Sequence, residues 1–426
     1  MQGHLLNIFL IIVILLAADF YILKGIQAGL KKRVFTHTRW FLIVYWLSAA
    51  FFITALLLGI YSKLGAGTRA GFLFGFALTF LFKLSFLFVI FIDDIRRGII
   101  YLTRKNKQPV TPLPAQAQTK PDAIPRSEFL MKAGLLAGVV PLAAIKLSMA
   151  KGLYDYHVKY VDLYLPNLPK AFDGMRVGQI SDIHSGSFYN KTAVKGGVEM
   201  LLKEKPDLVF FTGDLVNDSA WEMRGYQDIF SNVKAPLGVF SILGNHDYGD
   251  YGKWPSPAIK VQNHEGLIKC HKNMGWDLLV DEHRRLKVDG EEIGLLGIGN
   301  WGEMSRFPKY GRMDKAVKNT DDLPVKLLLS HDPSHWRAEV LPKYPQIDAV
   351  FAGHTHGMQF GVRTKEFQWS PIEYVYSEWA GLYREGNQQI YVNVGYGFAG
   401  FAGRVGILPE ITIFTLKAAS DPSLKA

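Results

Sequence analysis

Cysteine is almost absent from this chain, because Cys270 is the only one among its 426 residues. A single thiol cannot form an intrachain disulfide, and without a second cysteine at ligand spacing it cannot build a cysteine-rich zinc site. Domains without disulfides occur on both sides of a membrane, so this shortage leaves the compartment open. We therefore interpret Cys270 as a packing residue.

A dense basic stripe is also missing, although the formal charge is +10 and the isoelectric point is about 9.3. Many lysines and arginines instead flank long hydrophobic segments. This distribution is typical of a membrane protein and argues against a nucleic-acid partner.

Residues 5–23, 40–61 and 71–92 are apolar stretches of about the 20 residues that a membrane-spanning helix needs. The first lacks a basic leading region and a small-residue cleavage site, so we do not interpret it as a signal peptide. Basic residues after the first and third stretches predict that those loops are cytoplasmic and the N-terminus is outside. Asp19 in the first stretch and Lys83 in the third fall at similar depths in the membrane, which predicts that they form an ion pair. The pair would be either structural or part of a polar path through the helices.

The segment 129–150 decides on which side of the membrane the rest of the chain lies. Only 13 uncharged residues separate its Lys132 from Lys146, a length that fits a fourth crossing, a signal anchor or an interfacial helix. A crossing, which we favour, places the following domain outside the cytoplasm; otherwise that domain lies on the cytoplasmic face. The predicted organisation is a three-helix transmembrane region (1–98), a basic proline-rich cytoplasmic linker (99–128), this helix, and a second domain (154–417).

From residue 154 onward, short apolar runs alternate with polar and helix-like segments. Helices are predicted at 193–204 and 258–274, and this alternation indicates a layered α/β or α/β/β sandwich. The expected strands are 158–165, 175–180, 207–211, 238–243, 292–299, 325–329, 349–352, 389–395 and 406–416.

Five polar motifs follow five of these runs, at the strand ends where open α/β sheets place their ligand sites. They are SDIH (181–184), TGD (212–214), GNHD (244–247), SHD (330–332) and GHTH (353–356). Any one motif recurs by chance, but five in order behind hydrophobic runs indicate one site. Their Asp, His and Asn side chains suit two borderline divalent ions, Mn, Fe or Zn, which activate water in hydrolytic centres. The candidate ligands are Asp182, His184, Asp214, Asn245, His331, His354 and His356.

This motif set resembles that of the calcineurin-like metallophosphoesterase family over residues 173–416. The resemblance implies a four-layer α/β/β/α sandwich with two metal ions and a hydrolase activity. It also implies that His246 is a non-ligand histidine that stabilises the transition state or protonates the leaving oxygen, with Asp247 orienting it. By position, the first metal would be held by Asp182, His184 and His356, the second by Asn245, His331 and His354, and both by the bridging Asp214.

A narrower resemblance, through residues 392–412, is to membrane-linked bacterial members that hydrolyse UDP-diacylglucosamine. It implies a membrane-anchored hydrolase of a phosphodiester or pyrophosphate bond in a phosphorylated small molecule or lipid. The alternative is a sensory, transport or scaffold protein whose domain binds ligand without turnover; the oligomeric state is left open. Arg363 and Arg404 would meet substrate phosphate or lie at the surface. Six aromatic residues after the motif strands would either form an apolar rim for acyl chains or pack within the domain: Tyr248, Tyr251, Trp254, Trp301, Phe307 and Tyr310.

Overall fold

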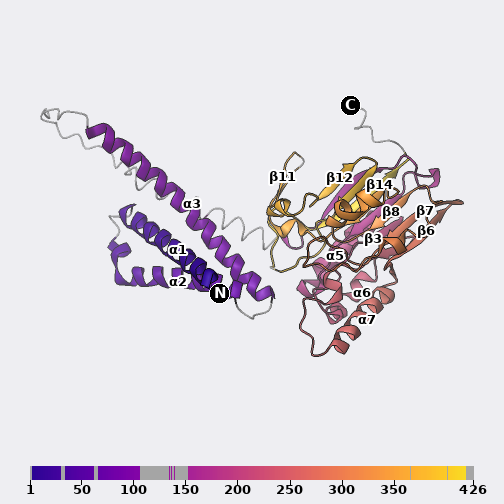
Figure 1. Ribbon diagram of the computed structural model, residues 1–426, viewed down its shortest axis with the longest axis horizontal. Coiled ribbons are helices and arrows are strands. Elements are labelled where there is room, and N and C mark those ends of the chain that lie inside the picture. The colour runs from indigo at the N-terminus through magenta and orange to yellow at the C-terminus, as the bar shows by residue number, and fades with distance from the viewer. Residues whose placement is uncertain are drawn as a thin grey trace. The chain divides into compact units, whose positions relative to one another are not determined.

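The computed structural model divides the chain into two compact units, Met1–Leu147 and Ser148–Ala426, each described here by itself (Figure 1). It describes residues 2–29, 34–61, 66–105, 134, 136, 139, 152–364, 366–400 and 402–418. The predicted linker after residue 105 lies outside the described residues. The predicted fourth crossing does too, except for Gly134, Leu136 and Val139, which are helical.

The N-terminal unit consists of α1 (Gln2–Gly29), the short 3₁₀ helix η1 (Val34–His37), α2 (Arg39–Tyr61) and α3 (Ala66–Lys105). Three helices of the described part are long and apolar enough to cross a membrane, over Ile8–Ala28, Arg39–Tyr61 and Gly75–Thr103. The three predicted spans are therefore present. The third helix continues through 99–105, which the sequence had assigned to the linker, because its residues there still favour helix over turn.

The predicted ion pair between the first and third spans is confirmed. Lys83 Nζ of α3 lies 2.7 Å from Asp19 Oδ1 of α1. From α2, the Tyr45 hydroxyl donates to the Asp19 carbonyl oxygen at 2.7 Å. An unpaired charge is costly at membrane depth, which explains why Asp19 and Lys83 pair. The ion pair and the tyrosine hydrogen bond together connect α1 to both α2 and α3.

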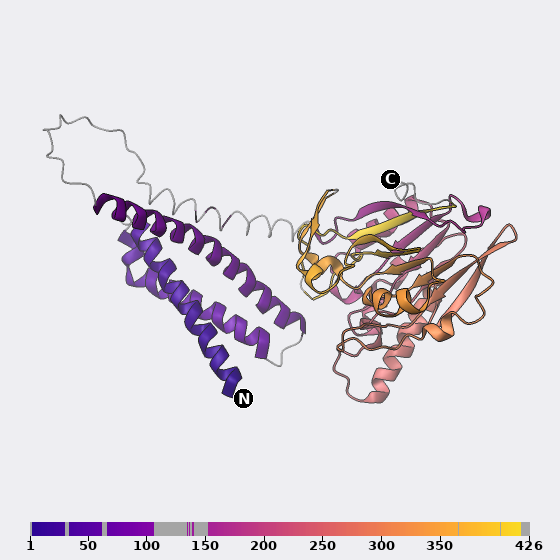
Figure 2. The ribbon, with the colours of Figure 1, turned by 45° about the horizontal axis from the view of Figure 1, so that its top comes forward.

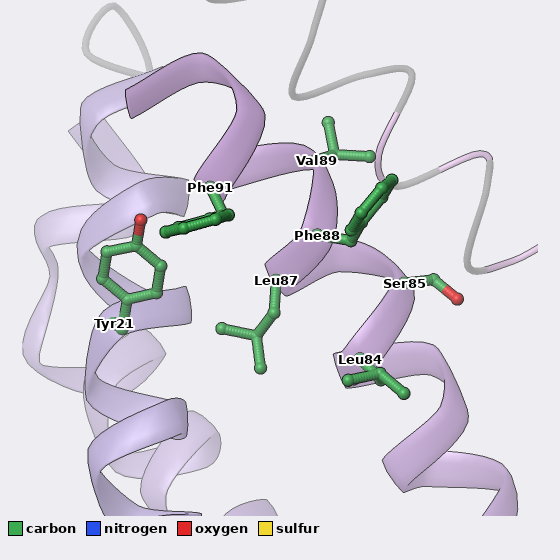
Figure 3. A pocket seen from close by; sticks show the side chains of 7 residues that line it. All are labelled: Tyr21, Leu84, Ser85, Leu87, Phe88, Val89 and Phe91. Atoms are coloured by element: carbon green, nitrogen blue, oxygen red, sulfur yellow. The ribbon is translucent and has the colours of Figure 1, made fainter. Parts of the chain in front are cut away.

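A pocket of about 710 Å³ is lined by side chains of α1 and α3 (Figure 3). The hydroxyl of Tyr21, on the α1 side, donates to Asp94 Oδ2 at 2.5 Å. The other lining residues belong to α3 and are mostly apolar: Leu84, Ser85, Leu87, Phe88, Val89 and Phe91. Such a lining suits hydrocarbon more than a polar ligand.

The second unit contains two six-stranded sheets and one small hairpin. The order of the first sheet is β1-β14-β2-β3-β4-β5, with β1 (His157–Tyr164), β2 (Arg176–Ile180), β3 (Leu208–Phe211), β4 (Val239–Ser241), β5 (Asp277–Leu278) and β14 (Glu410–Lys417). The order of the second is β12-β13-β9-β8-β7-β6, with β6 (Glu282–Val288), β7 (Glu291–Gly297), β8 (Lys326–Leu329), β9 (Ala349–Ala352), β12 (Gly381–Glu385) and β13 (Gln388–Val392). The hairpin pairs β10 (Val362–Arg363) with β11 (Gln368–Trp369).

Helices surround these sheets. The α-helices are α5 (Lys191–Lys203), α6 (Gln227–Phe230), α7 (Pro257–Met274), α8 (Met313–Ala316) and α9 (Leu341–Lys343). Short 3₁₀ helices are η2 (Lys170–Phe172), η3 (Ser185–Ser187), η4 (Ala220–Gly225), η5 (His246–Tyr248), η7 (His356–Gln359) and η8 (Pro371–Tyr374), and a π-helical turn η6 covers Trp336–Val340.

Three hydrophobic cores stack these elements into four layers (Figures 1 and 2). The strands β3 and β14 pack one face against α5, α6 and α7. Their opposite faces meet β8 and β9, where the rings of Phe210 and Phe351 lie 4.9 Å apart. The outer face of the second sheet packs on α8 and η6. The predicted α/β/β/α sandwich is therefore confirmed. Successive side chains of a strand point to opposite faces of its sheet, so alternate residues of β3 and β14 enter the two different cores.

Candidate metal centre

The five polar motifs follow β2, β3, β4, β8 and β9. Within each sheet these strands are parallel neighbours. Their C-terminal ends therefore present the motif residues along one edge of the sandwich. Several of these residues adopt a left-handed backbone, which L-residues avoid at about 1–2 kcal/mol each and which is typical of functional sites. The φ angles are 52° at Asp182, 47° at His184, 60° at Asp214, 73° at His354 and 51° at His356.

The structure brings six predicted ligands into two groups whose candidate ligand atoms lie within 4.8 Å of one another. The first ligand group is Asp182, His184 and His356, and the second is Asp214, His331 and His354. Asp214 Oδ2 lies 3.2 Å from His331 Nε2 of its own group and 3.5 Å from His184 Nε2 of the other. Asp214 therefore lies between the two groups, where one carboxylate can contact both ions.

The seventh predicted ligand, Asn245, adjoins the second ligand group. Its Oδ1 faces His354 Nδ1 at 2.8 Å, and its Nδ2 donates to the Tyr251 hydroxyl at 3.0 Å. The tyrosine thus fixes which end of the amide faces the histidines. All seven candidate ligands are consequently close together, although their assignment to particular ions remains a prediction.

The chemistry of these groups fits divalent ions. The Nε2 atoms of His184, His331 and His356 are buried and have no hydrogen-bond partner among the described residues. Buried polar atoms in folded proteins almost always have a partner, so three such atoms facing carboxylates need an explanation. Two cations held by imidazole nitrogen and carboxylate oxygen, as Mn, Fe and Zn are, would satisfy all three.

The protonation states also suit metal binding. Burial raises the pKa of Asp182, but the neighbouring His356 lowers it more, and the net pKa lies well below the ordinary value. For His184, burial lowers the pKa to about 3. Burial also acts to lower the pKa of His331, but Asp214 outweighs it and raises that pKa to about 10. The centre thus combines ionised carboxylates with a neutral His184, as metal binding requires, whereas His331 would have to give up its proton to a bound cation, because only a neutral imidazole can be a ligand.

Residues outside the predicted set orient the ligand rings. His331 Nδ1 donates to the Thr212 carbonyl oxygen at 2.7 Å, and His184 Nδ1 lies 3.1 Å from Asn217 Oδ1. The Tyr376 hydroxyl lies 2.9 Å from His354 Nε2 and also donates to Asp332 Oδ2 at 3.3 Å. Such contacts fix the ring orientation and tautomer of ligand histidines. Of these residues, Thr212 in the TGD motif and Asp332 in the SHD motif carried a local sequence signal, and Asn217 and Tyr376 did not.

His246 lies beside the first ligand group without belonging to it. Its ring centroid is 4.9 Å from that of His184, and its Nδ1 donates to the Asn217 carbonyl oxygen at 2.6 Å. Asp247 was expected to orient this ring. Its carboxylate instead accepts the backbone N–H groups of Gly244 and Asp214, each at 2.9 Å. The buried Asp247 carboxylate therefore connects the loops after β3 and β4. The His246 ring is held by the Asn217 carbonyl instead.

Two arginines and most of the aromatic set are structural. Arg404 is fully buried and donates to main-chain carbonyls, including those of Gly397 at 2.6 Å and Val394 at 2.8 Å. Arg363 forms an ion pair with the buried Glu410. Arg404 is therefore not at the surface, which was one of the two expectations for it, and both arginines have partners within the protein. Of the six aromatic residues, only Tyr251 and Tyr310 are exposed, each at 42%, so packing describes the others better.

Together, an α/β/β/α sandwich and two adjacent Asp/His groups at its strand ends define a class of metal-binding domains that supports hydrolysis. Two family models match this chain. Residues 175–358 match the calcineurin-like phosphoesterase model, and residues 5–153 match the model of a transmembrane domain of probable calcineurin-like phosphoesterases. The chain belongs to the calcineurin-like phosphoesterase family and is a membrane protein.

Three curated relatives match between 47% and 61% of this chain. An uncharacterized metallophosphoesterase of Bacillus subtilis, YkuE, is 30% identical over 254 residues, which are 59% of this chain and 82% of that protein. A transmembrane protein with metallophosphoesterase domain of Danio rerio is 30% identical over 61% of this chain, and the match spans only 58% of the fish protein. UDP-2,3-diacylglucosamine pyrophosphatase LpxG of Chlamydia trachomatis is 27% identical over 47% of this chain and 70% of its own length.

Proposed function

We propose that this protein is a membrane-anchored hydrolase that uses two divalent metal ions to cleave a phosphodiester or pyrophosphate bond. The observation that carries the proposal is the set of three buried imidazole Nε2 atoms without hydrogen-bond partners, each facing an ionised carboxylate. Their clustering with carboxylates in two adjacent ligand groups, rather than the missing partners alone, indicates metal ligands.

In this proposal the first ligand group would hold the first ion, and His331, His354 and the Asn245 amide oxygen would hold the second. Asp214 would be shared by both ions. When bound, Mn, Fe or Zn would activate water and offset the charge that develops on the phosphoryl oxygens. The roles of the surrounding residues are to fix these ligands: Thr212, Asn217 and Tyr376 through ring nitrogens, and Tyr251 through the amide.

His246 is the proposed proton donor to the leaving oxygen. Because its Nδ1–H is held by the Asn217 carbonyl, Nε2 is the nitrogen that can transfer a proton. Attack of water breaks the bond between phosphorus and the leaving oxygen, and that oxygen takes the proton from His246. The attacking water supplies the proton that restores the imidazolium when the product leaves.

We expect His246→Ala to lower kcat by about 10²- to 10⁴-fold with little change in KM, because the proton is needed mainly in the transition state. The measurement is metal-dependent turnover of bis(p-nitrophenyl) phosphate by the full chain in detergent. His157→Ala, which removes an exposed histidine of β1, is the matched control. Full turnover in His246→Ala would remove this residue from the mechanism. If the unaltered chain binds both metals and turns over no phosphoester, the domain binds ligand without catalysis.

We propose a substrate with two phosphoryl groups, such as a lipid-linked nucleotide of the UDP-diacylglucosamine type on which the Chlamydia relative is named to act. Arg306 supports this choice. Its guanidinium lies 4.6 Å from the centre of the Phe307 ring, and that ring packs edge-on against His354 at 4.6 Å. An exposed cation one ring away from a metal ligand can bind a second phosphate while the first is at the metals.

Arg306→Gln should therefore raise KM for UDP-diacylglucosamine about tenfold, the effect of losing one charge-assisted hydrogen bond. Its KM for bis(p-nitrophenyl) phosphate, which has one phosphoryl group, should change far less. Arg312→Gln is the control, because Arg312 is exposed on the same loop and pairs with Asp314. Equal changes for both substrates would show that Arg306 does not bind a second phosphate.

We propose further that the catalytic unit lies outside the cytoplasm, through a fourth crossing between residues 129 and 150. The positive loops that orient the first three spans support this side, and the matched transmembrane model extends to residue 153. A full chain with Cys270→Ala and Tyr160→Cys carries one exposed thiol, on β1. In intact cells we expect that thiol to react with a membrane-impermeant maleimide. Reaction only after lysis would place the unit in the cytoplasm.

A further inference from the structure

The stretch 358–375, just after the GHTH motif, exposes several large apolar side chains. The exposed fractions are 53% for Met358, 60% for Phe367, 77% for Tyr374 and 55% for Val375. We call these four residues the hairpin surface, because they lie on and around the β10–β11 hairpin, which projects from the edge of the catalytic unit (Figure 1). Water-soluble domains rarely gather exposed apolar groups of this size without a binding role.

The hairpin surface is built on a fixed local structure. Ser370 Oγ, at the start of η8, donates to the Gly357 carbonyl oxygen of η7 at 2.8 Å. Val362 of β10 pairs with Trp369 of β11, and Gly361 N donates to the Val405 carbonyl oxygen at 2.9 Å. The elements that carry the four apolar residues are thus tied to one another and to the chain before β14.

The same turn serves the metal centre and the hairpin surface. The residues from His356 to Gln359 are all left-handed, with φ of 51°, 53°, 54° and 56°. Three of them are not glycine, and each such residue costs about 1–2 kcal/mol. The turn directs the buried His356 toward the first ligand group and leaves Met358 exposed two residues later. Strain of this kind persists where function requires it.

We propose that the hairpin surface docks on the lipid bilayer to which the chain is anchored. Three helices able to span a membrane belong to the same polypeptide, so this bilayer is present at every copy of the protein. Under the fourth crossing proposed for residues 129–150, the described part of the second unit begins at Gly152, within a few residues of the membrane boundary in sequence. Phenylalanine, tyrosine and methionine are side chains that enter the boundary between headgroups and acyl chains.

Docking at this place would bring a lipid-borne phosphate to the metal centre without removing the lipid from the bilayer. Within the hairpin surface, Met358 is only two residues from the candidate ligand His356. The proposed bilayer contact and the first ligand group therefore share the turn η7. The inference does not depend on turnover, since the surface would bind lipid even if the domain did not hydrolyse it.

The test measures contact between the hairpin surface and lipid in the full chain. Cys270→Ala removes the only native thiol, and Phe367→Cys or Tyr374→Cys then introduces one site for an environment-sensitive fluorophore. Tyr160→Cys and Trp221→Cys are matched controls, because these aromatic residues are 67% and 65% exposed elsewhere on the unit. Each variant is reconstituted into phosphatidylcholine vesicles with ordinary or brominated acyl chains.

We expect brominated chains to reduce emission roughly twofold or more at positions 367 and 374, as for a label held within the acyl boundary, and to leave positions 160 and 221 unchanged. Equal quenching at all four positions, or none at 367 and 374, would overturn the proposal. Labels at 367 and 374 that are shielded from iodide but unaffected by bromine would overturn it too, and would identify a protein surface or a second copy as the occupant. Two independent sites, each checked by thermal unfolding, guard against a misfolded variant.

Discussion

Replacing Asp214 by asparagine is expected to lower kcat by about 10³-fold or more, because the bridging position requires two anionic oxygens. In the structure one oxygen lies within 3.5 Å of histidines from both ligand groups. The other accepts the His246 backbone N–H at 2.9 Å, which also positions the proposed proton donor. An amide keeps the shape of this side chain but offers a single neutral acceptor, so it weakens the binding of both ions and disturbs His246.

The measurements are turnover of bis(p-nitrophenyl) phosphate and metal content of the purified full chain. We expect the content to fall from about two ions per chain to one or fewer. Asp162→Asn, which makes the same chemical change at an exposed position of β1, should retain both turnover and metal. A variant at Asp214 that retains two ions and normal kcat would disprove the bridging assignment and with it the proposed centre.

Removing the Arg404 guanidinium should have the largest effect on stability. Burial lowers the pKa of Arg404 to about 10, which still leaves the buried side chain charged at neutral pH. Its charge is offset by main-chain carbonyls, since its nitrogens donate to those of Val394, Gly397 and Ile407. Arg404→Gln would leave several of these oxygens buried without a donor. We expect a loss of about 3–5 kcal/mol in the free energy of unfolding.

For a unit of this size, that loss corresponds to a fall in Tm of about 10 °C, measured by the tryptophan fluorescence of the full chain on heating. Arg404→Lys should recover only part of the loss, because an ammonium cannot reproduce the planar fork of donors. The control is Arg312→Gln, which removes an exposed ion pair and should change Tm by no more than about 2 °C. An unchanged Tm in Arg404→Gln would mean that water replaces the guanidinium.

Every strand predicted from an apolar run is present, with ends that differ by a few residues. The strands missed were β5, β6, β10, β11 and β12, which are polar or very short. In β6, for example, Leu286 is the one buried residue, and most of its neighbours are charged, so the apolar signal is lost. Edge strands of this kind form because a neighbouring strand offers hydrogen bonds, and their own sequence carries little information about that neighbour.

For the metal centre, the sequence provided all seven candidate ligands but few of the residues that hold them. Tyr376 contacts His354 across 22 positions of sequence, and Asn217 contacts His184 across 33. Arg404 was interpreted as a surface or phosphate-binding residue, although its Nη2 lies 3.2 Å from His356 Nδ1. Neither a tyrosine nor an arginine outside a motif carries a local signal of such a contact.

By itself, the sequence determined the three spans, the central parallel strands and the residue types of the metal centre. Each of these is a local property, because hydrophobic length and period, or a short motif after an apolar run, require no knowledge of distant residues. The pairing of Asp19 with Lys83 was also within reach, since membrane depth is a one-dimensional coordinate.

Only the tertiary structure decided which histidine faces which carboxylate, which partners orient the rings, and that Arg404 is buried. It alone placed the exposed apolar residues of the hairpin surface beside the turn that carries His356. These features depend on how two sheets and their connecting loops pack together. Burial and contact are properties of that packing, and the sequence of any one segment does not contain them.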